Sequence, residues 1–250
     1  MKLTLVTVSY NSSDTLRETI QSVRDQGLPN LEYLIIDGGS EDDTISVIEE
    51  NRDVVTRWIS EPDMGIYDGI NKGIRMATGD VVGFLHADDR FAADDILKQV
   101  VQAFENNPID FLYGDLEYVT SFSPKRVVRY WESGRFSPSK LRRGWMPPHP
   151  TVYFKKELVD RIGFFNIDLS ISSDYDWMLR CLQIRDLRVY YLHRVMVQMG
   201  MGGISNRNIS SIIRKSLEDY RAIRNNKMGG IATLVLKNIR KLPQFFRKNA

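Results

Sequence analysis

Short apolar runs alternate with amphipathic segments along the first half of the chain. The runs are rich in β-branched and aromatic residues, which is typical of buried strands. They lie at 3–8, 31–36, 56–60, 81–85 and 109–113, and 56–60 is the weakest. Between them apolar residues recur every three or four positions, as at Leu16, Ile20 and Val23, which predicts helices. Strands that alternate with helices in this way indicate βαβ units and a parallel sheet, hence an α/β fold.

The second half of the chain has a less regular pattern. A basic, aromatic and proline-rich segment at 115–150 is interpreted as a loop or a lid over a site. The pattern then predicts helices at 155–162 and 174–182, a strand at 188–192, a turn at Gly202-Gly203 and a basic helical tail from 208.

Composition places the chain among globular proteins. Of its 250 residues, 42% are hydrophobic and 26% are charged, which argues against disorder and for one large domain. The single cysteine, Cys181, excludes an intrachain disulfide and any multi-cysteine metal site. No run approaches the ~18 apolar residues of a membrane span, and the first residues lack a signal-peptide pattern. We therefore expect a cytoplasmic protein.

Charge is distributed unevenly along the chain. Residues 207–250 contain 11 Lys and Arg against 2 Asp and Glu, whereas residues 1–206 contain 23 against 30. An acidic body argues against general nucleic-acid binding, while a basic tail suits an anionic surface such as a membrane leaflet. Two interpretations of the tail stay open: a helix packed on the domain with a solvated basic face, or an interfacial segment that docks on anionic lipid.

Acidic residues follow the ends of two predicted strands. Asp37 ends one strand, and His86-Ala87-Asp88-Asp89 follows another. Ligands of parallel sheets bind at the carboxyl ends of strands, so we expect these residues to share one crevice. Asp88 and Asp89 could hold Mg²⁺ or Mn²⁺ together with nucleotide phosphates, or merely cap the next turn. Asp37 could contact a nucleobase or stabilise its own turn.

Two further groups are candidates for chemistry. Asp174 and Asp176 open an apolar helix, where they would favour the helix dipole or one could act as a general base. Among the three histidines, His149 is the best functional candidate, because neighbouring prolines fix its backbone. The chain has no GxGxxG, Walker, HExxH or GxSxG motif, so dinucleotide, P-loop, zinc-protease and serine-hydrolase interpretations lose their main support.

Taken in order, seven segments resemble a family 2 glycosyltransferase of the GT-A fold, of the type found in bacterial polysaccharide biosynthesis. They are VTVSYN at 6–11, IIDGGSEDDT at 35–44, 61–73 with ATGD at 77–80, FLHADD at 84–89, HPT at 149–151, SDYDW at 173–177 with Leu179-Arg180, and GGIS at 202–205. The resemblance implies a Rossmann-like, mostly parallel sheet flanked by helices, with the basic tail as a C-terminal helical extension. It divides the chain into a nucleotide-sugar half at 1–115, an acceptor half at 116–206 and the tail at 207–250.

The same resemblance implies an inverting transfer from a nucleotide-diphosphate sugar, usually a UDP-sugar, to a glycan or lipid-linked acceptor. It implies Mn²⁺ or Mg²⁺ on Asp88 and a general base at Asp174, with Asp176 as the competitor. It places Thr7, Ser9, Tyr10, Asp37, Asp63, Lys72, His86 and Ala87 at the nucleotide, and His149 and Asp89 on the acceptor or diphosphate side. His86 stands where the family's metal motif commonly begins with Asp, so it is expected to donate to the ribose or to a phosphate.

Two other classes stay open on the sequence. One is a metal-dependent nucleotidyltransferase on a similar sheet, although the first strand is followed by Tyr10-Asn11-Ser12-Ser13 rather than a glycine- and lysine-rich loop. The other is a non-catalytic protein that binds sugar nucleotides.

Overall fold

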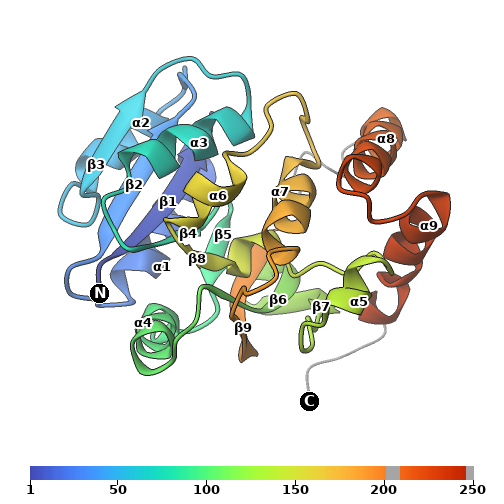
Figure 1. Ribbon diagram of the computed structural model, residues 1–250. Helices are drawn as coiled ribbons and strands as arrows, with labels where there is room; N and C mark the ends of the chain where they lie inside the picture. The colour runs from blue at the N-terminus through green and yellow to red at the C-terminus, as the bar shows by residue number, and fades with distance from the viewer. Residues whose placement is uncertain (201–208, 246–250) are drawn as a thin grey trace.

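The computed structural model describes residues 1–200 and 209–245. Within these residues, nine strands form one curled sheet in the order β3-β2-β1-β4-β8-β6-β9-β5, and β7 pairs with β6 (Figure 1). The strands are β1 (Leu3–Ser9), β2 (Glu32–Asp37), β3 (Arg57–Ser60), β4 (Val81–Phe84), β5 (Asp89–Phe91), β6 (Phe111–Phe122), β7 (Lys125–Trp131), β8 (Tyr153–Lys155) and β9 (Val189–Gly200).

The first half is the predicted alternation of strands and helices. Strands β1 to β4 are mutually parallel, and all six residues of β2 are buried. The helices are α1 (Ser13–Arg24), α2 (Thr44–Glu50), α3 (Ile66–Met76) and α4 (Ile96–Asn106). Because the strands are parallel, the residues that follow β1, β2 and β4 all lie at one edge of the sheet.

The second half adds antiparallel strands to the predicted, mostly parallel sheet. Strand β8 is antiparallel to both β4 and β6, and β5 is antiparallel to β9. The segment at 115–150 is not mainly a loop: β6 and β7 form a hairpin, followed by α5 (Pro138–Leu141) and a 3₁₀ turn at His149–Thr151. Of the basic residues that suggested a loop, Lys125, Arg126 and Arg129 lie on β7, which pairs only with β6 among the described strands. Such exposed edge strands commonly carry charged side chains.

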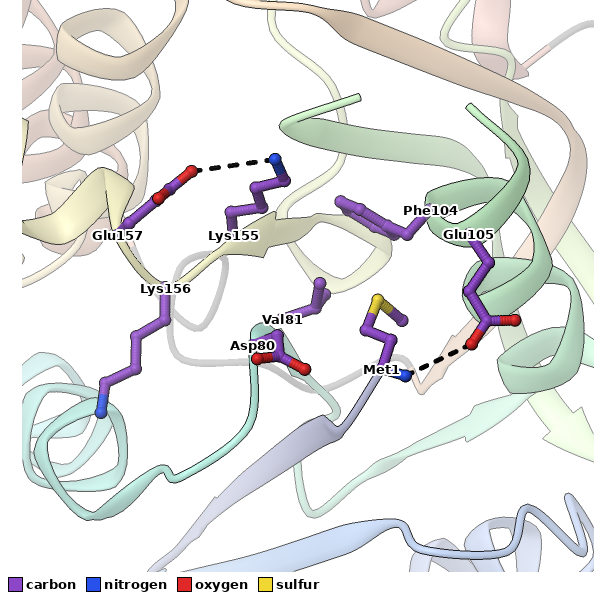
Figure 2. Close-up of a pocket in the computed structure, with 8 residues that line it drawn as sticks. All are labelled: Met1, Asp80, Val81, Phe104, Glu105, Lys155, Lys156 and Glu157. Atoms are coloured by element: carbon purple, nitrogen blue, oxygen red, sulfur yellow. Dashed lines mark hydrogen bonds and ion pairs between the residues drawn. The ribbon is translucent and has the colours of Figure 1, made fainter. Parts of the chain in front are cut away.

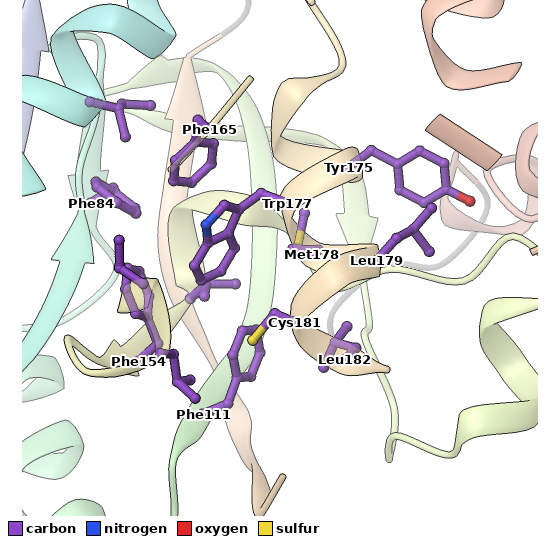
Figure 3. Close-up of a cluster of buried hydrophobic side chains, with 14 of the residues drawn as sticks. Phe84, Phe111, Phe154, Phe165, Tyr175, Trp177, Met178, Leu179, Cys181 and Leu182 are labelled. Carbon is purple, nitrogen blue, oxygen red and sulfur yellow. The ribbon is translucent and has the colours of Figure 1, made fainter. Parts of the chain in front are cut away.

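A cluster of aromatic side chains fixes α7 (Ser173–Leu182) against the sheet (Figure 3). The Trp177 ring stacks on Phe165 at 5.1 Å and lies 4.6 Å from Phe154, between ring centroids. Its indole N–H donates to the Gly163 carbonyl at 3.1 Å. Cys181 is buried in this cluster, and burial raises the pKa of its thiol to about 12, which keeps it unreactive. The start of α7 is therefore held rigidly.

The basic tail folds onto the domain. After α6 (Leu158–Ile162) and α7, the chain continues into α8 (Ile209–Asn225), α9 (Ile231–Ile239) and a 3₁₀ turn at Leu242–Phe245. A hydrogen bond from the Thr233 hydroxyl to the Arg142 carbonyl ties α9 to the loop after α5. None of the helices in the described ranges is long and apolar enough to cross a membrane. The predicted turn at Gly202-Gly203 lies outside the described residues.

Candidate active site

The carboxylate of Asp37 organises the turn after β2. It is fully buried, and it accepts hydrogen bonds from the hydroxyls of Ser9 at 3.1 Å and Ser60 at 2.7 Å, which lie beside it on β1 and β3. It also accepts the backbone N–H groups of Gly39 and Ser40. Of the two open interpretations, the turn role is thus present in the structure, and it shapes the loop on which a base could lie.

Asp63 lies against this turn from the loop before α3. A Cβ atom added at Gly38 would come 2.8 Å from Asp63 Oδ2, so a larger residue there would displace the Asp63 carboxylate. Burial raises the pKa of Asp63, and the charges of Asp68 and Asp37 add to this against the opposing charge of Lys72. Lys72 itself is held by Glu61 at 2.9 Å, an ion pair that contributes to its raised pKa. Asp63 therefore lies beside the Asp37 turn, and Lys72 is paired nearby with Glu61 and Asp68.

The first-strand candidates differ in accessibility. Tyr10 is exposed, and Ser9 is bonded to Asp37 as described. Thr7 is fully buried: its hydroxyl donates to the Leu85 carbonyl at 2.7 Å and lies 3.0 Å from the Tyr33 hydroxyl. Because Thr7 lies two residues before the strand end, neighbouring strands cover its side chain, which supports the end of β4 instead of reaching the surface.

The segment after β4 brings a neutral histidine between two carboxylates. Burial lowers the pKa of His86, while the negative charges of Asp88 and Asp174 act in the opposite direction. The His149 ring lies 5.7 Å from that of His86 and stacks on Phe84 at 5.1 Å. Burial lowers the pKa of His149 to about 3, and the neighbouring His86 contributes, so this imidazole is also neutral. Ala87, the residue after His86, is buried in the hydrophobic core.

Asp88 and Asp89 have different environments. Asp88 is half-buried, and its backbone carbonyl packs so closely on Gly200 that a Cβ there would come within 2.8 Å. Asp89 is fully buried at the start of β5, and its carboxylate oxygens have no hydrogen-bond partner within the described part of the chain. Burial, with the charge of Asp88, raises the pKa of Asp89 well above its ordinary value. Asp88 is therefore the carboxylate available to a ligand.

The residues present fit a divalent cation that is bound partly by the protein and partly by the phosphates of a bound nucleotide. No group of three or more His, Cys, Asp or Glu side chains suited to a metal occurs in 1–200 and 209–245. Mg²⁺ and Mn²⁺ in nucleotide sites commonly take one or two protein carboxylates and complete their shell with phosphate oxygens and water. One accessible carboxylate at Asp88 meets that requirement.

Asp174, at the start of α7, accepts the Tyr175 backbone N–H at 2.7 Å and lies beside Tyr67, a residue that the sequence did not single out for function. The Tyr67 hydroxyl, on α3, lies 3.3 Å from Asp174 Oδ1 and donates to the Ile171 carbonyl at 2.7 Å. Burial raises the pKa of Asp174, and Lys237 and Lys215 partly offset this. Tyr67 thus joins the loop that carries Asp63 to the proposed base.

The Asp176 side chain is instead bonded to neighbouring side chains in the interior. Its carboxylate pairs with Arg180 Nε at 2.9 Å and accepts a hydrogen bond from Asn226 Nδ2 at 2.8 Å, and it is buried. Both oxygens are therefore committed to α7 and α8. This arrangement favours Asp174 over its competitor as the base.

Glu218, on α8, is a second residue that the sequence gave no reason to choose. Its buried carboxylate accepts the backbone N–H groups of Ser170, Ile171 and Ser172, and the Ser170 hydroxyl at 2.8 Å. These residues lead directly into α7. The tail therefore fixes the loop that positions Asp174, although a lone Glu far from any motif carries no sequence signal.

A cavity of about 500 Å³ lies at the opposite edge of the sheet (Figure 2). It is lined by Met1, by Asp80 and Val81 where β4 begins, by Phe104 and Glu105, and by 155–157. Since ligands of parallel sheets bind at the carboxyl ends, this amino-end cavity is not the candidate active site.

Comparison with known proteins places the chain in a family. The sequence profile described as "Glycosyl transferase family 2" matches residues 4–163. The chain belongs to glycosyltransferase family 2. This family 2 enzyme is 35% identical to an uncharacterized glycosyltransferase of Mycobacterium tuberculosis over 184 residues, which is 71% of this chain and 68% of the relative. It is 27% identical over 221 residues to a protein of Mycobacterium bovis named "PGL/p-HBAD biosynthesis glycosyltransferase", covering 85% and 82% of the two chains.

Solved structures show that this glycosyltransferase has the GT-A fold. S. aureus TarS 1–349 in complex with UDP-GlcNAc matches 90% of the chain with a TM-score of 0.70 and 18% identity. The mannosyltransferase PcManGT from Pyrobaculum calidifontis, in complex with GDP-Man and Mn²⁺, matches 98% with a TM-score of 0.67 and 20% identity. The chain spans 65% of TarS 1–349, 39% of the longer TarS chain and 73% of PcManGT. At these identities the likeness establishes the fold alone.

Proposed function

We propose that this glycosyltransferase is an inverting enzyme that moves a sugar from a nucleotide-diphosphate sugar to an acceptor hydroxyl. The observation that carries the proposal is the placement of His86 within electrostatic range of both Asp88 and Asp174. Asp88 follows β4 at the sheet edge where Asp37 and Asp63 lie. An accessible carboxylate for a cation and a separate, partly buried carboxylate for a proton are the two groups that a single displacement needs.

We propose a UDP-sugar as donor, with GDP-sugars as the competing class. The structural neighbours were solved with UDP-GlcNAc and with GDP-Man, which supports a nucleotide-diphosphate sugar for this fold. In this proposal the base lies near Asp37 and Asp63, and Tyr10, Ser9 and Lys72 surround the nucleotide. The donor half is then 1–115, the acceptor half is 116–206, and the tail follows.

In the proposed mechanism, Asp88 would hold Mn²⁺ or Mg²⁺, which would neutralise charge on the leaving diphosphate. Neutral His86 donates a hydrogen bond to the ribose or a phosphate, and His149 and Asp89 form the wall behind it. The Tyr175 backbone N–H, which donates to Asp174 Oδ1 at 2.7 Å, keeps the Asp174 carboxylate oriented. Asp174 removes the proton of the acceptor hydroxyl as that oxygen attacks the anomeric carbon from the face opposite the diphosphate.

The pH dependence of turnover follows from the burial of Asp174. Burial raises its pKa above the ordinary carboxylate value, and a general base acts only when deprotonated. We therefore expect kcat to fall as pH decreases, with an acid limb centred above pH ~4, the range of an ordinary Asp. A pH–rate profile at saturating donor tests this; a rate independent of pH between 4 and 7 would argue against a buried carboxylate base.

A panel of donors tests the proposed reaction. The protein is incubated with Mn²⁺ and UDP- or GDP-sugars, and the nucleoside diphosphate released to acceptor or water is measured. Release of UDP from one UDP-sugar supports the proposal. Pyrophosphate release from a nucleoside triphosphate would instead identify a nucleotidyltransferase, and binding without release from any donor would identify a non-catalytic binder.

We also propose that the tail docks the enzyme on an anionic bilayer, at the inner face of the cell membrane. The face of α9 that points outward is apolar: Ile231 is 69% exposed, and Val235, Ile239 and Leu242 continue the same stripe. Its buried face carries Thr233 and Lys237, the reverse of an ordinary surface helix. We call the outward stripe the apolar ridge.

Helix α8 adds charge and further apolar surface beside the apolar ridge. Ile213 and Leu217 are 57% and 58% exposed. Arg221 and Arg224 are exposed on the same face of the helix, and Arg214 borders it. Apolar and basic side chains on one surface are the combination that inserts at an anionic interface. A lipid-linked acceptor would then be presented to the enzyme at the membrane.

Replacing one residue of the apolar ridge tests the docking. Ile239→Glu puts a charge where an isoleucine would enter the interface, and we expect binding to anionic phospholipid vesicles to weaken about tenfold or more. Ile167→Glu, at an exposed isoleucine outside the tail, is the matched control and should bind as wild type. Co-sedimentation measures both. Equal binding by all three proteins would show that the ridge is not the docking surface.

A further inference from the structure

A second cavity lies between the hairpin and the tail. Its volume is about 240 Å³, and β7, the loop after α5, and the end of α9 with the following 3₁₀ turn enclose it. The walls include Trp131, Trp145, Lys237, Arg240, Lys241 and Gln244, and Glu132 is an exposed acidic residue among them. This volume lies below the ~300–1,000 Å³ of sites for drug-sized ligands, so it suits a headgroup.

Cationic groups crowd this cavity. Burial lowers the pKa of Lys241 to about 8, and the positive charges of Lys215, Lys237 and Arg129 contribute. Asp219 is the carboxylate that opposes them, and it is already paired with Lys237 at 2.5 Å. Arg129 is bound to Gln244 and stacks over Tyr118 at 4.5 Å. The excess positive charge in this region is what an anionic ligand would neutralise.

The cavity adjoins the proposed base. Lys237 lines the cavity, and its ammonium lies 3.4 Å from the centre of the Tyr175 ring, the residue after Asp174. Lys237 and Lys215 are also the cations whose charge lowers the pKa of Asp174. Lys237 therefore links the cavity to the start of α7, where the proposed base lies.

The cavity wall is also continuous with the apolar ridge. Arg240 and Lys241 line the cavity, and in the chain Ile239 and Leu242, both exposed, flank them. Two tryptophans complete the wall, and aromatic faces with cations beside them suit a phosphorylated sugar or lipid. The polar headgroup and an apolar chain would thus find adjacent surfaces.

We propose that this cavity binds the phosphate or diphosphate group of the acceptor, and that the acceptor is a phosphate-bearing lipid or glycan. The inference rests on the proposed transfer reaction, whose acceptor it specifies. Lys241 and Arg240 contact the phosphate oxygens, and Lys237 remains paired with Asp219 behind them.

Calorimetric titration with inorganic pyrophosphate tests the site without turnover. The titrations contain EDTA, so that a metal-dependent donor site does not contribute. We expect Lys241→Gln to weaken pyrophosphate binding about tenfold or more, because one charged hydrogen bond is lost. Lys98→Gln removes the same charge from an exposed position on α4, away from the cavity, and this variant should bind pyrophosphate as wild type does. Equal affinity of wild type and Lys241→Gln, or an equal loss in both variants, would overturn the proposal.

A second ligand distinguishes a phosphate-bearing lipid from a phosphorylated glycan as the acceptor. Farnesyl diphosphate carries the same headgroup with an apolar chain. Tighter binding than pyrophosphate, with the gain lost in Ile239→Glu, supports a lipid acceptor. Equal binding of both ligands, lost together in Lys241→Gln, supports a phosphorylated glycan.

The Tm of Lys241→Gln shows whether a loss of pyrophosphate binding comes from unfolding of the variant. Removing one charge from a repulsive cluster should leave the Tm of Lys241→Gln unchanged or raise it by about 1–3 °C. A large fall in Tm would show that Lys241 holds the fold and would count against a binding role. Donor hydrolysis is measured in parallel: hydrolysis without Lys241-dependent pyrophosphate binding overturns this site alone, and binding without hydrolysis overturns the transfer reaction alone.

Discussion

Asp174→Asn is expected to lower kcat by about 10²–10⁴-fold, the usual contribution of a general base. The amide oxygen can still accept the Tyr175 backbone N–H, so the local structure and the affinity for UDP should stay within about twofold of wild type. Initial rates of nucleoside diphosphate release, together with calorimetric titration of UDP in the presence of Mn²⁺, measure the two effects separately. Asp168→Asn, on an exposed loop before α7, is the matched control and should be fully active.

The variant Asp176→Asn tests whether Asp176, instead of Asp174, is the general base. Because Asp176 pairs with Arg180 and Asn226, we expect this variant to lose stability of about 1–3 kcal/mol, seen as a fall of several degrees in Tm, with kcat retained within a few fold. The opposite pattern, an active Asp174→Asn and an inactive but folded Asp176→Asn, would transfer the role to Asp176.

Asp88→Asn should remove the gain in UDP affinity that Mn²⁺ provides and reduce turnover about 10²–10³-fold. The reason is that a cation at the diphosphate is worth several kcal/mol, and each ~1.4 kcal/mol corresponds to a factor of ten. Titrations of UDP with and without Mn²⁺ give the metal-dependent difference directly. Asp94→Asn, an exposed aspartate on the following loop, should retain it. A Mn²⁺-dependent gain that persists in Asp88→Asn would place the cation elsewhere.

The first half of the fold could be predicted from the sequence because its signals are local. Each strand of β1 to β4 is an apolar run, and the intervening helices have apolar faces, so period and length decide the assignment. The β6–β7 hairpin could not be recognised in this way. Its edge strand carries Lys125, Arg126 and Arg129, and residues on an unpartnered edge need not alternate between apolar and polar.

The same contrast applies to the site. Asp37, Asp88 and Asp174 could be proposed because strand ends, a helix start and a family resemblance pointed to them. Tyr67 and Glu218 could not, since each acts through a tertiary contact with the segment that leads into or starts α7. Asp88 and Asp89 look equivalent in sequence, and only burial separates an accessible carboxylate from one whose pKa is raised well above its ordinary value.

The tail has features of both interpretations that the sequence left open, a packed helical extension and an interfacial segment. Glu218, Asn226 and Lys237 pack the tail on the domain, as in a structural extension; Lys237 does so over the Tyr175 ring. Their outward faces nonetheless remain apolar and basic, which sequence periodicity alone could not reveal because the buried face of α9 is the polar one.

A crystal structure of Asp174→Asn with a UDP-sugar and Mn²⁺ tests the central claim most directly. We predict that the cation lies at Asp88, that the nucleobase lies beside Asp37 and Asp63, and that residue 174 faces the anomeric carbon from the side opposite the diphosphate. A nucleotide bound at the opposite edge of the sheet, or an anomeric carbon out of reach of residue 174, would contradict the account.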